Sequence, residues 1–366
     1  MKEKNIPWAS PYFGGSEQKY VLDAVQSGWI SGGDYVERFE ADFSRFSGSP
    51  FTVTASNGTT ALHMAYLALG IGLGDEVIVP GFGFMAAANI ALHIGAKPVF
   101  SEVDPDTWCM TARDVERCIT TKTKAIVPIH TYGNVCDMDS IMEVANRNGL
   151  AVLEDAAEAI GSKYLGKMAG TIAPVGIYSF HATKTITSGE GGAAVTNDTE
   201  LCDRMRLYRS HGMASKRYWH EVPGHNFRLT NMQAALGCAQ LEHVDQIIYE
   251  RDRVYRTYKS FLKNIDGISL QEFSEKVNAV VWAIGISLDK GAFSQGRDGL
   301  IDQLGGMGIE TRPGFYSANT MPHIYGDIQL PICESLSQII ISLPSSPTLT
   351  EEDIVYICES LESCKR

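Results

Sequence analysis

The sequence predicts an α/β protein in which a large domain with a mostly parallel central sheet precedes a smaller α+β domain. First, short apolar runs alternate with helical stretches up to about residue 230, a rhythm typical of a parallel sheet covered by helices on both faces. Second, the pattern beyond this point changes to long charged helices and shorter strands. Third, 366 residues exceed the usual length of one domain. We therefore expect a large domain at 1–250 and a small domain at 251–366.

Six apolar runs predict strands of the central sheet. They lie at 51–55, 75–80, 97–100, 124–128, 150–154 and 176–180. After the first of them, Ala61, Ala65 and Leu69 stand one helical turn apart, and 84–94 also has a helical pattern. Further expected elements are one long helix over 230–263, strands within 279–288, a glycine-rich turn at 305–308 and a final helix near 351–362.

The composition argues against several classes of protein. The 31 Lys and Arg against 43 Asp and Glu give a net charge of −12, which disfavours a nucleic-acid partner but leaves room for an anionic small molecule held by local donors. We find no apolar run of about 18 residues and no apolar signal segment in MKEKNIPWASPYF. Eight cysteines without a CxxC pair predict free thiols. We therefore expect a cytoplasmic protein without a metal site or a membrane contact.

The segment SNGTT at 56–60 lies between a predicted strand and a predicted helix. Gly58 permits a ligand to approach the backbone closely, and the first N–H groups of a helix are free and lie at the positive end of its dipole. The segment is therefore a candidate phosphate site. The alternative is simple capping of the helix by Asn57.

Two ionisable residues follow other predicted strands. Asp155 comes directly after an apolar run, where a carboxylate needs a cation or a strong donor; the alternative is an acid that the dipole of a following helix stabilises. Lys184 follows the strand at 176–180, and a lysine desolvated at this edge can act as a nucleophile, although most lysines are solvated surface residues. His181 nearby is either a ligand contact or a hydrogen-bonded core histidine.

A rival hypothesis rests on GFGFMA at 81–86, which fits the pattern G-x-G-x-x-A. Glu102 lies 19 residues beyond Gly83, and strand, glycines, helix and distal acid together are the signature of a Rossmann dinucleotide site. This would make the protein an NAD-dependent oxidoreductase. Pro80 before the first glycine and two phenylalanines at the turn count against it.

The phosphate site, the buried acid, the lysine and the aromatic face of Phe84 together are what pyridoxal phosphate requires. The lysine forms a Schiff base, the acid pairs with the ring nitrogen and keeps the ring electron-withdrawing, and the helix start anchors the phosphate. One hypothesis thus accounts for four strand ends, whereas the Rossmann hypothesis accounts for one.

Seven motifs resemble the DegT/DnrJ/EryC1/StrS family of sugar-nucleotide aminotransferases over nearly the whole chain. They are GWIS at 28–31, SNGTTALH at 56–63, GDEVIVP at 74–80, HTYG at 130–133 with CDMD at 136–139, EDAAEA at 154–159, KTITSGEGG at 184–192 and NFRLTNMQAALG at 226–237. The resemblance implies an aspartate-aminotransferase-like fold (fold type I), pyridoxal phosphate as cofactor with pyridoxamine phosphate as an intermediate, and a homodimer with shared active sites.

The resemblance also implies roles for individual residues. Lys184 would be the Schiff-base lysine and proton shuttle, and Asp155 would bind the ring nitrogen. Glu158 would approach the phenolic oxygen, where a carboxylate must be protonated or compensated. The implied cofactor-binding residues are Gly58, Thr59, Phe84, Asp155, Glu158, Ser179 and Lys184, with Asn226 reaching the phosphate of the neighbouring subunit.

The implied activity is transfer of an amino group from L-glutamate to C4 of a 4-keto-6-deoxy sugar nucleotide, with GDP-4-keto-6-deoxymannose favoured. The alternative substrates are UDP-, dTDP- or CMP-linked keto sugars, or a 3-keto sugar. Dehydratases of the family carry His in place of the lysine, so Lys184 favours transamination. Gly83 and HAT at 181–183 depart from the family pattern and bear on the sugar pocket. Candidate substrate-binding residues are Trp29, His181, Arg217, Arg312, Tyr316 and His323.

Overall fold

A seven-stranded sheet forms the centre of the molecule. The computed structural model describes residues 4–365 and places the strands in the order β1-β9-β8-β5-β4-β2-β3. Within this sheet β9 runs antiparallel to its two neighbours, whereas the remaining pairs are parallel. The mostly parallel sheet predicted from the sequence is therefore confirmed. The strands are β1 (Phe51–Ala55), β2 (Glu76–Pro80), β3 (Lys97–Ser101), β4 (Thr123–Ile126), β5 (Ala151–Asp155), β8 (Val175–Ser179) and β9 (Gly192–Thr196).

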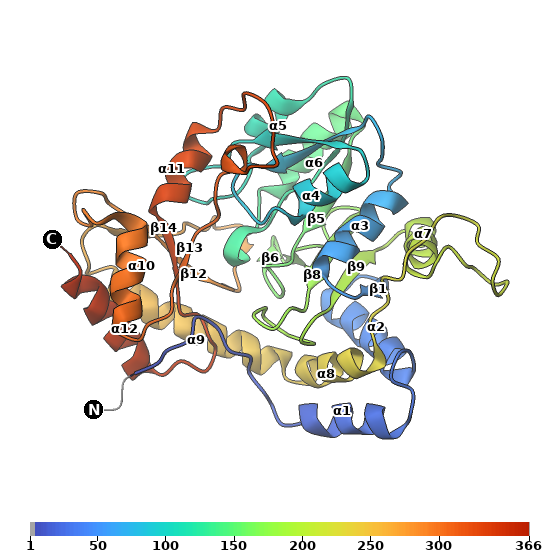
Figure 1. Ribbon diagram of the computed structural model, residues 1–366, viewed down its shortest axis with the longest axis horizontal. Helices are drawn as coiled ribbons and strands as arrows, with labels where there is room; N and C mark the ends of the chain where they lie inside the picture. Colours follow the sequence, from blue (N-terminus) through green and yellow to red (C-terminus); the bar gives the residue numbers. More distant parts are fainter. Residues whose placement is uncertain (1–3, 366) are drawn as a thin grey trace.

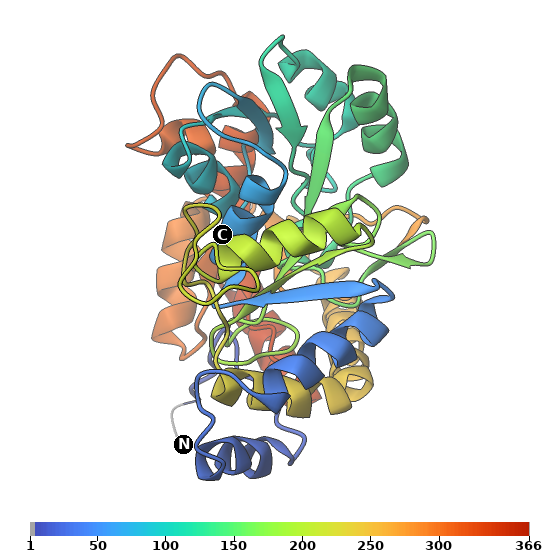
Figure 2. The same ribbon diagram turned by 90° about the vertical axis from the view of Figure 1, so that its right-hand side faces the viewer.

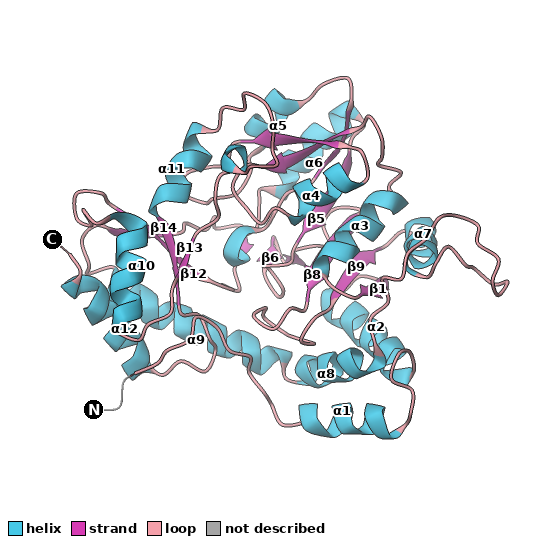
Figure 3. Ribbon diagram, in the orientation of Figure 1, coloured by secondary structure: helices cyan, strands magenta, loops and turns pink. Residues whose placement is uncertain are grey.

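Helices cover both faces of this sheet (Figures 1 and 3). Val77 and Val79 of β2 enter one apolar core, and Ile78 between them enters the core on the opposite face. Burial on both faces explains why the strands appear in the sequence as continuous apolar runs. Figure 2 shows α7 beside β1, the strand at one edge of the sheet. The helices are α1 (Glu17–Gln26), α2 (Asp34–Ser47), α3 (Gly58–Ala68), α4 (Ala86–His93), α5 (Ala112–Cys118), α6 (Met138–Asn148), α7 (Thr199–Arg209) and α8 (Asn231–Glu242).

The C-terminal part has its own four-stranded antiparallel sheet, in the order β10-β12-β14-β13, and a separate apolar core. The N-terminal Ile6 joins this core and pairs with Ile309. The division of the chain at residue 250 stays a prediction, and the structure places this residue inside the continuous helix α9. The elements are β10 (Ile268–Leu270), β12 (Ile284–Leu288), β13 (Arg312–Pro313), β14 (Ile340–Leu343), α9 (Val244–Leu262), α10 (Gly296–Gly306), α11 (Pro331–Ile339) and α12 (Glu351–Ser363).

Two expectations about the second half of the chain are wrong in part. The helix expected over 230–263 is divided at His243, which leaves the helical conformation at φ −113° and ψ 12°. The break lets α8 pack against α1 and α2 while α9 leads to the C-terminal sheet (Figure 1). Of the strands expected within 279–288 only β12 forms, and it begins at Ile284. The backbone before it is irregular, because the N–H of Val280 donates to Oγ of Ser162 and that of Trp282 to the carbonyl of Tyr132.

Short elements complete the fold. They are β6 (Lys163–Tyr164), β7 (Lys167–Met168) and β11 (Val277–Asn278), which form a small sheet, and the 3-10 turns η1 (Thr131–Gly133) and η2 (Ala318–Thr320). All eight cysteines are free thiols. In residues 4–365 no helix is long and apolar enough to cross a membrane. Over the same residues no group of three or more His, Cys, Asp or Glu side chains is gathered for a metal ion.

Candidate active site

A cavity of about 500 Å³ lies where β5 and β8 end and α3 begins. This position agrees with the rule that ligands of α/β sheets bind beyond the carboxyl ends of the strands. The cavity brings together all the residues proposed for the cofactor except Asn226, and two of those proposed for the substrate, His181 and Arg312. Those that line it are Gly58, Thr59, Phe84, Asp155, Glu158, Ser179, His181, Lys184 and Arg312.

Lys184 lies in the turn after β8, and its backbone N–H donates to the carbonyl of His181 at 2.9 Å. Its amine is 3.4 Å from the centre of the Trp282 ring and 3.7 Å from Oε1 of Glu158. The side chain is 12 % exposed. Burial lowers the pKa of Lys184, although the charges of Glu158 and Asp155 partly offset this effect. A lysine with a lowered pKa has the larger neutral fraction that a nucleophile or base needs.

Asp155 ends β5 and is buried in the wall of the same cavity. Oδ1 accepts a hydrogen bond from the N–H of Ala157 at 3.1 Å. Burial raises the pKa of Asp155, while the N–H of Ala157 and the charge of Lys184 act in the opposite direction. A buried carboxylate with so few donors and an open side toward a cavity fits a protonated ring nitrogen as its partner.

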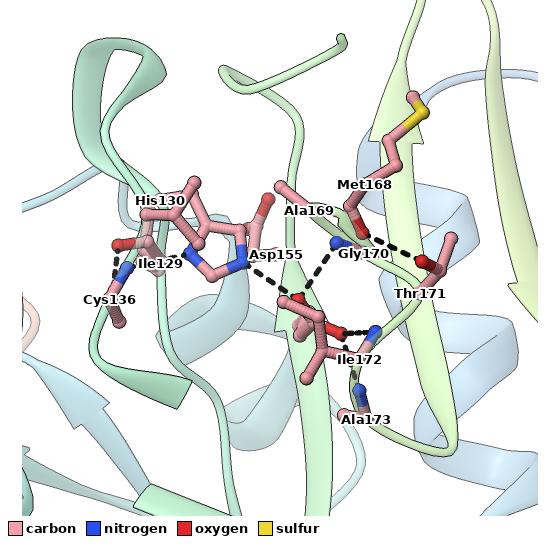
Figure 4. A network of polar contacts seen from close by, with 12 residues as sticks. Ile129, His130, Cys136, Asp155, Met168, Ala169, Gly170, Thr171, Ile172 and Ala173 are labelled. Carbon is pink, nitrogen blue, oxygen red and sulfur yellow. Dashed lines mark hydrogen bonds and ion pairs between the residues drawn. The ribbon is translucent and has the colours of Figure 1, made fainter. Parts of the chain in front are cut away.

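A mostly buried network of polar contacts fixes the strand end from the other side (Figure 4). Glu154 accepts hydrogen bonds from three backbone N–H groups within 170–173 and contacts Nε2 of His130 at 2.9 Å. The N–H of Cys136 donates to Nδ1 of that histidine at 3.3 Å, so Nε2 carries the proton and donates to the carboxylate. The backbone of His130 in turn donates to the carbonyl of Asp155 at 3.0 Å. The network therefore holds the strand end that carries Asp155.

Glu158 lies between the η1 turn and Lys184. Its Oε2 accepts a hydrogen bond from the N–H of Tyr132 at 2.9 Å, and its Oε1 faces the lysine amine. Burial raises the pKa of Glu158. The carboxyl group is thus held in one orientation by the backbone and faces the amine of Lys184 at ion-pairing distance.

The start of α3 fits a phosphate. Asn57 caps the helix by accepting the N–H of Thr60 at 2.9 Å, and Gly58 and Thr59 occupy the first turn, where backbone N–H groups have no partner within the helix. A Cβ atom placed on Gly58 would lie 3.0 Å from Cβ of Ser179. The glycine therefore keeps open a narrow cradle between the helix start and the serine hydroxyl.

Aromatic side chains form the remaining wall. Phe84 is 60 % exposed yet faces the cavity, which suits a residue that stacks on a bound ring. The rings of Tyr132 and Phe315 lie 5.2 Å apart, and those of Trp8 and Trp282 lie 5.6 Å apart. Sequence reasoning missed these last four residues. They come from the N-terminus, the η1 turn and the C-terminal part. Only Tyr132 lies in one of the quoted motifs, HTYG at 130–133, and no local signal marks the other three.

Only two of the six proposed substrate-binding residues line this cavity. Arg312 places its guanidinium 4.2 Å from the centre of the Trp8 ring, and His181 holds Nδ1 against Thr183 at 3.0 Å. The others lie outside it: Trp29 is in a separate hollow, Arg217 is in the segment that projects beyond α7 (Figure 1), Tyr316 contacts Arg297, and His323 contacts Asn89. Asn226, also outside, accepts a hydrogen bond from Arg228 at 3.0 Å.

The glycine motif at 81–86 does not form a dinucleotide site. Glu102, the acid that a Rossmann site would place on a ribose, accepts the backbone N–H groups of Ile332 and Cys333 at the start of α11. Its carboxylate is therefore committed to capping a helix. Gly83 has another role, because a Cβ there would meet Ile129 of the cavity wall at 3.2 Å.

Comparison with known proteins agrees with this geometry. Residues 11–362 match the model of the DegT/DnrJ/EryC1/StrS aminotransferase family. Two relatives named GDP-perosamine synthase are similar over nearly their full length: one from Escherichia coli O157:H7 (44% identity, 98% of each chain) and one from Caulobacter vibrioides (42% identity, 98% of this chain and 97% of the relative). A solved structure, the PLP-form of the sugar aminotransferase Spr1654 from Streptococcus pneumoniae, superimposes with a TM-score of 0.94 at 26% identity, covering 99% of this chain and 98% of that one.

Proposed function

The chain belongs to the DegT/DnrJ/EryC1/StrS aminotransferase family, and on that premise we propose that it moves the amino group of L-glutamate to C4 of GDP-4-keto-6-deoxymannose, giving GDP-perosamine. The names of the two relatives above 40% identity support the choice of sugar nucleotide. The observation that carries the proposal is the meeting of the largely covered Lys184 with the buried carboxylates of Asp155 and Glu158 in one cavity.

The cavity fits pyridoxal phosphate as cofactor. Asp155 would pair with its ring nitrogen, Phe84 would cover the ring, and Ser179 with the N–H groups of Gly58 and Thr59 would hold its phosphate. When bound, the cofactor supplies an electron sink for the electron pair left when a proton leaves the carbon that carries the nitrogen. The partly satisfied Asp155 carboxylate and the open cradle at Gly58 are the structural basis of this fit.

The chain's own residues would carry the protons. Lys184 would hold the cofactor through its amine and, once released, take a proton from the α-carbon of glutamate and later deliver one to C4 of the sugar. The lowered pKa of Lys184 favours the neutral amine that is needed to take the proton from glutamate. Glu158 would keep the amine in place through the contact at 3.7 Å. Arg312, at the cavity wall, is a suitable partner for a carboxylate or phosphate of either substrate.

We further propose that the active unit is a homodimer. Asn226 and Arg217 lie outside the cavity of their own chain, which is the position expected of residues that serve a neighbouring one. Leu22, Val25 and Trp29 expose apolar side chains on α1 and the turn after it, which supports a surface covered by a second copy.

The test is a panel of keto-sugar nucleotides incubated with L-glutamate, with products identified by mass. We expect conversion of GDP-4-keto-6-deoxymannose to a product in which NH₂ replaces the keto oxygen, with loss of this activity in K184A. K290A, which alters an exposed lysine remote from the cavity, should retain it. Turnover confined to UDP-, dTDP- or CMP-linked sugars, or to a 3-keto sugar, would contradict the proposed substrate, and full activity of K184A would contradict the mechanism.

A further inference from the structure

Arg251 on α9 is buried behind the active-site lysine. It is 4 % exposed, and its guanidinium donates to three backbone carbonyls: those of Lys184 at 3.2 Å, Trp282 at 3.0 Å and Ser345 at 3.3 Å. These acceptors belong to the turn after β8, the segment before β12 and the turn after β14. One side chain thus joins the central sheet to two segments of the C-terminal part.

This guanidinium has no carboxylate partner. Within residues 4–365 no Asp or Glu oxygen lies within ion-pairing distance of Arg251, and its Nε has no hydrogen-bond acceptor. Burial lowers the pKa of Arg251 to about 10. An unneutralised charge in the interior is expensive, and interior arginines are normally paired with an anion. Carbonyl dipoles alone compensate this one.

The residues that Arg251 contacts are linked by further hydrogen bonds to the groups around the amine of Lys184. Trp282 receives Lys184 on its ring face, and its indole N–H donates to the carbonyl of Thr183 at 2.7 Å. The backbone N–H of Trp282 donates to the carbonyl of Tyr132 at 3.0 Å, and the N–H of Tyr132 holds Glu158. Two of the three carbonyls that Arg251 joins, those of Lys184 and Trp282, therefore belong to the two residues whose side chains must meet.

We propose that Arg251 is a positioning residue for Lys184: its fork fixes the lysine backbone against Trp282, and its uncompensated positive charge lies behind the amine. This inference depends on the proposed function only in the catalytic role that is assigned to the amine of Lys184. The groups that face this amine act in opposite directions. Glu158, Asp155 and the ring face of Trp282 favour its protonated form, whereas burial and the charge of Arg251 lower the pKa of Lys184.

The experiment measures the amine directly in full-length protein from which any bound aldehyde has been removed with hydroxylamine. A trace of acetic anhydride is applied between pH 6 and pH 10, and the labelling of Lys184 is quantified by mass spectrometry relative to exposed Lys290. In R251Q, the loss of a nearby like charge should slow the labelling of Lys184 at pH 7.5 by roughly three- to tenfold and move its midpoint to higher pH. R251K keeps the charge and should keep the wild-type midpoint.

Arg253 provides a matched control on the same helix. It also reaches carbonyls of the C-terminal part, of Pro347 and Leu349, but it is paired with Glu250 and does not contact Lys184. R253Q should therefore leave the labelling of Lys184 unchanged. If R251Q does not fold, R251M removes the charge in its place, and R251K must still retain the wild-type midpoint.

Equal labelling of Lys184 in wild type, R251Q and R251K would overturn the proposal, and so would a midpoint displaced as far in R251K as in R251Q.

Turnover of R251K is a second measurement. An ammonium cannot span two carbonyls as a guanidinium fork does, so we expect kcat to fall about tenfold with KM values little changed. Labelling requires no transamination, so its outcome is independent of whether the proposed reaction is correct.

Discussion

Glu154 and Asp155 are neighbours on β5, both are buried carboxylates, and they point to opposite faces of the strand. Glu154 accepts three backbone N–H groups and the imidazole of His130, whereas Asp155 has the N–H of Ala157 and an open cavity. A carboxylate whose lone pairs are filled by the chain stabilises the fold, and one that the chain leaves short of donors is available to a ligand. Burial by itself does not distinguish the two roles.

The largest effect expected from this comparison is on activity. Asp155→Asn keeps the size of the side chain but removes the charge opposite the proposed ring nitrogen, so we expect kcat to fall about 10³-fold with the fold intact. Single-turnover kinetics with L-glutamate measure the change, and circular dichroism monitors the fold. If D155N instead unfolded while keeping its activity per folded molecule, Asp155 would be the structural member of the pair.

Glu154→Gln should lower the stability of the fold and leave the activity per folded molecule nearly unchanged. A glutamine amide has one oxygen in place of two, so it cannot accept all three backbone N–H groups and the N–H of His130. At least one buried donor is left without a partner, and we therefore expect a loss of about 3 kcal/mol in the free energy of unfolding. Urea unfolding measures the loss, and kcat per folded molecule should stay within about threefold of wild type. Unchanged stability together with abolished turnover would reverse the assignment.

The smallest effect is a pH dependence of stability. Since burial raises the pKa of Asp155 above its ordinary value of 3.8, the folded cofactor-free protein binds this proton more tightly than the unfolded chain does. Its contribution therefore destabilises the fold as the pH rises from about 3.8 through the raised pKa, and the stability returns when the pH falls. D155N should lose less stability than wild type over that window when both are unfolded in urea at a series of pH values. Parallel pH profiles of the two proteins would contradict the assigned shift.

The strand ends could be predicted from the sequence because their signals are local. An apolar run followed by Asp155, and another followed by Lys184, are readable one residue at a time, and the rule about carboxyl ends of strands then places them together. The same reasoning gave the parallel sheet and most strand positions. It also gave the wrong strand over 279–283, since apolar composition does not distinguish a strand from an irregular buried segment.

Other features carry no local signal. Trp282 under the lysine amine, Arg251 behind it and the capping of α11 by Glu102 each join segments far apart in the sequence. The sequence alone determined six of the seven strands of the central sheet, the lysine, the acid and the helix start for phosphate, because these depend on hydrophobic pattern and on the chemistry of single residues. Only the tertiary structure decided which buried charges are satisfied by the chain and which remain open to a ligand, because donor and acceptor partners are assigned by packing and not by order along the chain.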